Sequence, residues 1–212
     1  MREATRLCLI RHGETDWNRS RRIQGCVDVA LNGQGLRQAQ LVAAGLRGQP
    51  LAALYSSDLQ RAWQTAAAIG AATGLAPQAL AGLRERAYGV FEGLAVEEAR
   101  WRHPELYAAY SRRDPDCDFC GGESLRAVFA RASRQIETLA ARHVGASIAV
   151  VLHGGLLDAI NRFVRGIVLE APRDFAIPNA AFNWIRRDAT GWHVEIWGDT
   201  RHLEETADEL AA

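Results

Sequence analysis

Two histidines that each end an apolar segment are the residues of this chain best suited to do chemistry. The motif Arg-His-Gly at residues 11–13 follows apolar residues 5–10, and His-Gly-Gly at residues 153–155 follows residues 147–152. A neutral imidazole is a nucleophile, and the guanidinium beside it can donate two parallel hydrogen bonds to phosphate oxygens. A surface arginine and a structural histidine at a strand end are the alternative. The repetition of the pattern favours attack on a phosphoryl group.

Two further charged residues, Arg61 and Glu85, could take part in a reaction at a phosphoryl group. Arg61 follows the apolar residues 51–55, and capping by Ser57 or Asp58 would place it in the first turn of a helix, where an anion meets both its charge and the helix N-terminus. Glu85 lies between two arginines; held against a bound phosphate it would keep its proton and serve as a general acid. A solvated helix arginine and an ionised surface carboxylate remain open as alternatives.

Strands that alternate with helices must position these residues. Residues 5–10, 51–55 and 147–152 are almost continuously apolar, which is typical of strands covered on both faces. Residues 181–187 and 192–197 flank the turn signal Asp-Ala-Thr-Gly and predict a hairpin. We predict an α/β fold, a three-layer αβα sandwich whose mostly parallel sheet has an antiparallel edge strand. The expected helix faces are Leu36, Ala39, Ala43 and Leu46; Leu59, Ala62, Ala66 and Ile69; and Leu125, Val128, Phe129, Ala132, Ile136 and Leu139, the last after an N-cap at Ser124.

The length of 212 residues predicts one domain, residues 1–212, with a sizeable core. Residues 88–121 are less regular and are expected to form a small cap over the ligand end of the sheet. The aromatic residues of this region either line the ligand site or form the core of the cap itself, and we favour the second interpretation. They are Trp101, Tyr107, Tyr110 and Phe119.

Composition excludes several classes of function. The 25 basic residues, all arginine, balance 25 acidic ones, so no net charge attracts nucleic acid or a membrane surface. Without lysine there is no Schiff base and no P-loop lysine. The glycines at 33 and 35 lack the third glycine and the preceding strand of a dinucleotide fingerprint, and Cys117 and Cys120 lack partners for a zinc site. Neither a signal peptide nor a membrane-length apolar run is apparent, so a cytoplasmic location is expected.

Taken together, the motifs resemble the histidine phosphatase superfamily, the phosphoglycerate-mutase-like family. The resemblance implies that His12 attacks phosphorus and becomes phosphohistidine, while Glu85 protonates the leaving alkoxide and then activates water. It further implies phosphate contacts from Arg11, Arg61, His153 and Asn18, and neither a metal nor a cofactor, since guanidinium groups supply the positive charge. The matching residues are Arg11 to Thr15 with Asn18, Ser56 to Ala62, Glu85 with Tyr88 and Gly89, and His153 to Gly155.

The family contains hydrolases and mutases, and the chain favours the phosphatase branch. Arg112 and Arg113 resemble the mutase residues that would bind a carboxylate, although a solvated pair is the alternative. Val96, however, stands where the mutases have lysine, and the segment before Gly122 is short. We therefore predict a metal-independent phosphomonoester hydrolase that acts on small phosphorylated metabolites. A cofactor-dependent phosphoglycerate mutase is the first alternative, and a non-catalytic phospho-ligand binding module is the second.

The expected partner is a small phosphoester, whose identity the sequence constrains weakly. We expect the entrance to be lined by Arg21, Arg22 and Gln24, with Gly25 beside them, and to favour a second acidic group. Gly154 offers a backbone N–H. A homodimer contact is one role for the tryptophans near the hairpin, and a place in the core is the other. These are Trp184, Trp192 and Trp197.

Overall fold

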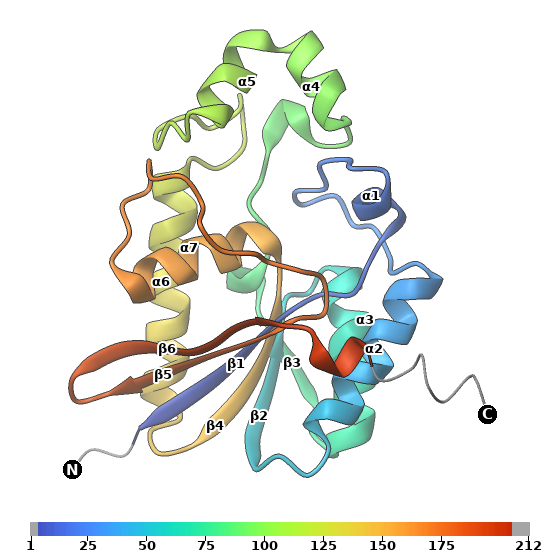
Figure 1. Ribbon diagram of the computed structural model, residues 1–212, viewed down its shortest axis with the longest axis vertical. Helices are drawn as coiled ribbons and strands as arrows, with labels where there is room; N and C mark the ends of the chain where they lie inside the picture. Colours follow the sequence, from blue (N-terminus) through green and yellow to red (C-terminus); the bar gives the residue numbers. More distant parts are fainter. Residues whose placement is uncertain (1–3, 205–212) are drawn as a thin grey trace.

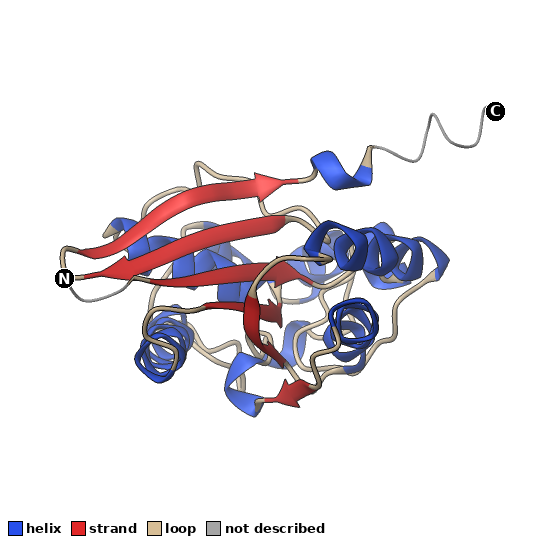
Figure 2. Cartoon of the chain, turned by 90° about the horizontal axis from the view of Figure 1, so that it is seen from below, coloured by secondary structure: helices blue, strands red, loops and turns tan. Residues whose placement is uncertain are grey.

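The computed structural model describes residues 4–204, which form one six-stranded sheet with helices on both faces (Figures 1 and 2). The strand order is β3-β2-β4-β1-β5-β6. The three strands predicted from apolar segments lie together at its centre and run parallel, so their carboxyl ends meet at one edge. They are β1 (Thr5–Arg11), β2 (Leu51–Ser56) and β4 (Ser147–Leu152).

The edges of the sheet differ from the prediction in two ways. The predicted hairpin is confirmed as β5 (Phe182–Asp188) and β6 (Gly191–Asp199), but the antiparallel strand β5 lies between β1 and β6, so the hairpin adds two antiparallel pairings and β6 is the edge strand. The other edge is β3 (Pro77–Ala79), which pairs in parallel with β2 and was not predicted. Three residues are too few for an alternating or apolar pattern to stand out from the sequence.

The core lies in two layers because successive side chains of a strand point to opposite faces of the sheet. Leu7 and Leu9 of β1 pack with α6 (Leu125–Arg142) and α7 (Gly154–Arg165), whereas Cys8 and Ile10 pack with α2 (Gly33–Leu46) and α3 (Gln60–Thr73). Burial raises the pKa of the Cys8 thiol, as expected for a core cysteine. The αβα sandwich is thus confirmed.

The predicted helix faces are largely confirmed. The hydroxyl of Ser124 accepts a hydrogen bond from the Ala127 N–H, so it is the N-cap of α6. Leu36 is the exception, because it is 49% exposed at the start of α2 while the other three residues of its set are buried. Its neighbour Gly35 instead occupies the buried position, against the backbone of Glu14.

Two short helices, α4 (Val96–Arg102) and α5 (Pro104–Ser111), lie beyond the carboxyl ends of the strands (Figure 1). They enclose a small apolar cluster of Phe91, Ala99 and Phe119, with Tyr107 packed against it. Trp101 belongs neither to this cluster nor to a ligand wall, since it is 81% exposed, and both interpretations of it were wrong. The remaining short elements are α1 (Asp16–Arg19) and the 3-10 turns η1 (Ala81–Leu83), η2 (Gly89–Phe91) and η3 (Arg201–Leu203).

A helix that crosses a lipid bilayer must be long and predominantly apolar. None of the helices in residues 4–204 combines the length and the apolar character that a membrane span needs.

Candidate active site

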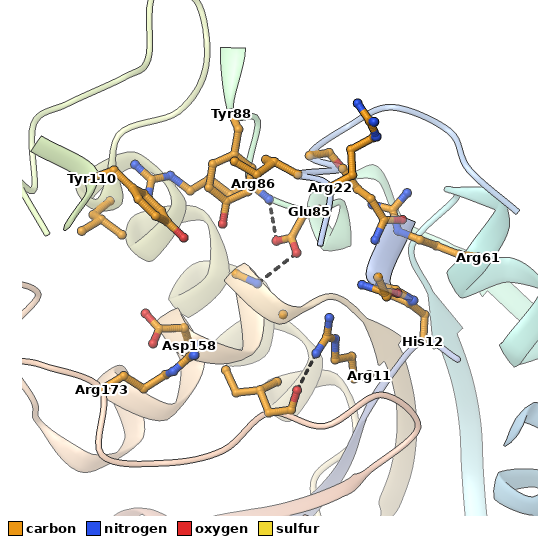
Figure 3. A pocket seen from close by; sticks show the side chains of 18 of the residues that line it. Arg11, His12, Arg22, Arg61, Glu85, Arg86, Tyr88, Tyr110, Asp158 and Arg173 are labelled. Carbon is orange, nitrogen blue, oxygen red and sulfur yellow. Dashed lines mark hydrogen bonds between the residues drawn. The ribbon is translucent and has the colours of Figure 1, made fainter. Parts of the chain in front are cut away.

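A cavity of about 330 Å³ lies beyond the carboxyl ends of β1 and β4 (Figure 3). Most of the residues predicted to bind or react line it, although they come from distant parts of the chain. Arg112 is not among them, and His153 lies just behind the wall. The predicted residues that line the cavity are Arg11, His12, Asn18, Arg22, Gln24, Gly25, Arg61, Glu85, Arg113 and Gly154.

His12 follows the last residue of β1, and its ring is held in one tautomer. Nδ1 lies 2.7 Å from the carbonyl oxygen of Gly13. Because a carbonyl can only accept, Nδ1 carries the hydrogen and Nε2 keeps its lone pair. Burial lowers the pKa of His12 well below its ordinary value, and the charges of Arg61 and Arg11 act in the same direction. The ring is therefore neutral and has a nucleophilic nitrogen.

The turn after His12 is fixed by residues that the sequence did not single out. The amide of Asn179 donates to the carbonyl oxygens of His12 and Gly13, and the Gly13 N–H donates to the Thr65 hydroxyl. A Cβ on Gly13 would lie 2.5 Å from the Gly35 carbonyl oxygen, so only glycine fits there. The nucleophile is thus held by contacts from α2, α3 and the segment before β5.

Four buried nitrogens around His12 have no hydrogen-bond partner among the described residues. They are Nε of Arg11, Nε of Arg61 and both ring nitrogens of His153. The His153 ring lies 5.2 Å from that of His12, centre to centre. Buried polar groups are normally satisfied, and leaving one unpaired costs about 1–3 kcal/mol. The cluster is therefore suited to an anion that accepts several hydrogen bonds.

Arg61 is held by main-chain oxygens in place of a carboxylate. Its two terminal nitrogens donate to the carbonyls of Gly25 at 2.7 Å and Val27 at 2.9 Å, and it makes no ion pair within residues 4–204. Burial lowers the pKa of Arg61. Gly25 has a φ of +52°, and a Cβ there would lie 2.0 Å from Oε1 of Glu92, so both the backbone conformation and the Glu92 side chain favour glycine at this position.

The helix that carries Arg61 is not capped in the way the sequence suggested. Asp58 pairs with Arg84 at 2.6 Å, and Ser57 does not cap α3. The Gln60 N–H donates instead to Oδ1 of Asp28 at 2.7 Å. The predicted cap at Ser57 or Asp58 was therefore wrong, because a carboxylate from a distant loop takes that place.

Glu85 faces the cavity between two backbone donors. Its oxygens accept from the Arg86 N–H at 2.8 Å and the Gly155 N–H at 3.0 Å. Arg84 is occupied by Asp58, and the guanidinium of Arg86 donates to carbonyls, so neither flanking arginine neutralises Glu85. Within the described part of the chain it is a carboxyl without an ion pair, placed at the same cavity as His12.

Three other predicted residues of the cavity, Asn18, Gln24 and Arg22, are held by hydrogen bonds to nearby groups. Oδ1 of Asn18 accepts from the Thr15 N–H, which leaves its amide group for the cavity. The Thr15 hydroxyl donates to Gln24 at 3.0 Å. Arg22 donates to the carbonyl of Gly93 and lies 3.8 Å from Glu98.

The two adjacent arginines that the sequence predicted for substrate binding, Arg112 and Arg113, have different surroundings. Arg112 is exposed and pairs with Asp114, so its expected role in binding was wrong. Arg113 lines the cavity but pairs with Asp158 at 2.7 Å. Tyr110 and Arg173 complete the far end of the cavity. Asp158 and Arg173 were missed, because the first looks like an ordinary helix carboxylate and the second lies in a segment without a motif.

The amino-acid sequence of the chain is also similar to the sequences of known proteins. A sequence model of the "Histidine phosphatase superfamily (branch 1)" matches residues 7–200. The chain belongs to the histidine phosphatase superfamily. No group of three or more histidine, cysteine or acidic side chains suited to a metal ion occurs in the part that the structure describes.

Relatives of this histidine phosphatase cover nearly its whole length. It is 40% identical to "Phosphoglycerate mutase-like protein 4" of Arabidopsis thaliana, over 94% of this chain and 87% of that protein. It is 37% identical to "Metal-independent phosphoserine phosphatase" of the same plant, over 95% and 84%. A solved phosphoserine phosphatase of Entamoeba histolytica, in complex with 3-phosphoglyceric acid, is 26% identical over 94% of this chain and 99% of that chain, with a TM-score of 0.85.

The two buried imidazoles of this histidine phosphatase predict a loss of stability in mild acid. Burial lowers the pKa of both His12 and His153, so the native state stays neutral where the unfolded chain, with histidine pKa near 6.5, takes up protons. Stability is therefore present above about pH 6.5 and falls below it, by about 1.4 kcal/mol per pH unit for each histidine. Urea unfolding at pH 7.5, 6.5 and 5.5 in phosphate-free buffer measures this. His12→Asn should have a distinctly smaller slope, and equal slopes would contradict the assignment.

Proposed function

We propose that this protein hydrolyses phosphate monoesters of small metabolites through a phosphohistidine on His12, without a metal. The observation that carries the proposal is the neutral His12 ring, with Nε2 unprotonated, beside four unpartnered nitrogens of Arg11, Arg61 and His153. A nucleophile and donors for the equatorial oxygens of a phosphoryl group are thus already in place before substrate binds.

In the first step, Nε2 of His12 attacks phosphorus in line, a nitrogen–phosphorus bond forms and the bond to the leaving oxygen breaks. Arg11 and Arg61 stabilise the charge on the phosphoryl oxygens. His153 joins them as an N–H donor, and burial lowers the pKa of its ring. Glu85 gives its proton to the leaving alkoxide.

In the second step, Glu85 takes a proton from water as the water attacks the phosphohistidine. Inorganic phosphate leaves and His12 regains its lone pair. The choice of Glu85 follows from its lack of an ion pair, since Asp158, the other carboxyl that lines the cavity, is shared by Arg113 and Arg162.

The far end of the cavity supports hydrolysis over phosphoglycerate mutase activity. The carboxylate clamp that the sequence allowed is not assembled, because Arg112 points to Asp114 outside the cavity and Arg113 is paired with Asp158. The relative named as a metal-independent phosphoserine phosphatase supports the same choice.

Phosphate release from 4-nitrophenyl phosphate and 3-phosphoglycerate, in the presence of EDTA and across pH 5 to 8, tests the proposal. We expect turnover that EDTA does not reduce. Interconversion of 3- and 2-phosphoglycerate that depends on a bisphosphoglycerate primer, with little phosphate release, would identify a mutase instead. Binding without either reaction would identify the non-catalytic module.

A further inference from the structure

Arg173, which lines the cavity, differs from the other arginines around it in its hydrogen bonds and ion pairs. Residues 166–181 connect α7 to β5 (Figure 1), and two of them, Arg173 and Ile177, line the cavity. Four other arginines hold this segment. Arg113 donates to the carbonyl of Leu169, Arg162 to that of Val168, Arg11 to that of Ile177, and Arg165 pairs with Asp174. Arg173 of the same segment makes no hydrogen bond or ion pair with any residue from 4 to 204.

Arg173 lies at the end of the cavity away from the nucleophile. Figure 3 shows its side chain on the side of Asp158 and Tyr110, while His12 and Arg61 lie across the cavity. A substrate whose phosphate is at His12 would therefore present its leaving group to Arg173. Burial raises the pKa of Tyr110, with Arg173 acting in the opposite direction, so the phenol keeps its hydrogen and can donate to the same group.

The charges of the cavity exceed what one phosphate can offset. Six arginines and two carboxyls line it, and one of the carboxyls, Asp158, is already shared by Arg113 and Arg162. Arg11 and Arg61 face the phosphoryl group, which leaves the positive charge of Arg173 at the other end. An excess of one sign in a cleft favours a ligand with complementary charges at matching positions.

We propose that Arg173 binds a second anionic group on the leaving group, a carboxylate or a phosphoryl group, and so selects phosphate esters that carry two acidic groups. This inference rests on the proposed hydrolase function and adds a specificity-determining residue to it. Arg173 acts on the substrate and not on the reacting atoms, so its effect appears in kcat/KM for diacidic substrates.

Pairs of substrates that differ in one group test the inference. 3-Phosphoglycerate and glycerol 3-phosphate differ in a carboxylate against a hydroxymethyl group, and fructose 1,6-bisphosphate and fructose 6-phosphate differ in a second phosphoryl group. We expect the wild-type protein to prefer the diacidic member of at least one pair by about tenfold in kcat/KM, the effect of one hydrogen bond between charged groups. The pair that shows the preference identifies the anion.

In Arg173→Gln the preference should fall to about threefold or less, and Arg173→Lys should restore part of it. The ratio is measured within one variant, so a loss of folded protein does not change it. Arg126→Gln is the matched control, because Arg126 follows the cavity residue Leu125 but pairs with Asp116. It should keep the wild-type ratio.

Equal rates for both members of both pairs, an unchanged ratio in Arg173→Gln, or an equal loss in Arg126→Gln would each overturn the role of Arg173. Those results leave the hydrolase function intact. Failure of every ester, including 4-nitrophenyl phosphate, to release phosphate would instead overturn the proposed function itself.

Discussion

Replacing His12 with alanine is expected to lower kcat by about 10⁴-fold or more, because the variant lacks the atom that we propose accepts the phosphoryl group. The fixed tautomer leaves Nε2 as the ring's nucleophilic atom. Rapid acid-free quenching with ³²P-labelled substrate should trap a base-stable, acid-labile phosphoprotein in the wild type and none in His12→Ala.

His193→Ala is the matched control, since His193 lies on the β5–β6 hairpin and does not line the cavity. It should retain wild-type turnover and the trapped intermediate. Retention of more than a small fraction of activity in His12→Ala, or label on another residue, would overturn the phosphohistidine mechanism.

Replacing Glu85 with glutamine is expected to separate substrates by leaving group. Glutamine cannot donate an acidic proton, so kcat/KM for 3-phosphoglycerate, whose leaving group is an alkoxide, should fall by about 10²–10⁴-fold. 4-Nitrophenolate leaves without protonation, so its kcat/KM should fall by about tenfold or less.

In the proposed mechanism the second step also needs Glu85, which gives a further signature. With 4-nitrophenyl phosphate, Glu85→Gln should release nitrophenolate in a burst equal to the enzyme concentration and then slowly, as phosphohistidine accumulates. Glu105→Gln, an exposed carboxyl of α5 outside the cavity, is the control and should show neither effect. Equal losses on both substrates without a burst would remove Glu85 from the acid–base role.

The sequence predicted the centre of the sheet and most of the residues that line the cavity because those features are local. An apolar strand that breaks into a histidine and a glycine is visible in a few residues, and parallel strands must bring such ends to one edge. Hence His12, Arg61, Glu85 and most other expected residues line one cavity or, like His153, lie directly behind it.

What the sequence did not predict depends on contacts between distant segments. Asp28 caps α3 from 32 residues away, which no local pattern reveals. Arg112 and Arg113 are adjacent, yet one pairs with Asp114 and the other with Asp158. The backbone of Arg113 is left-handed just after the end of α5, a change of direction that the sequence does not reveal. The proposed role of Arg173 could be inferred only from the structure, in which the neighbouring arginines already bond to carbonyl oxygens or carboxylates.

Several arginines of the cavity form hydrogen bonds to main-chain carbonyl oxygens, and this affects how the proposed product, inorganic phosphate, would bind. Arg11, Arg61 and Arg86 all donate to carbonyl oxygens, and none forms an ion pair within the described residues, so no carboxylate has to be displaced when an anion enters. Inorganic phosphate meets the same preformed donors as the substrate does. For the proposed hydrolase we therefore expect competitive inhibition by its product, so that the rate in a cell would depend on how much free phosphate surrounds the protein.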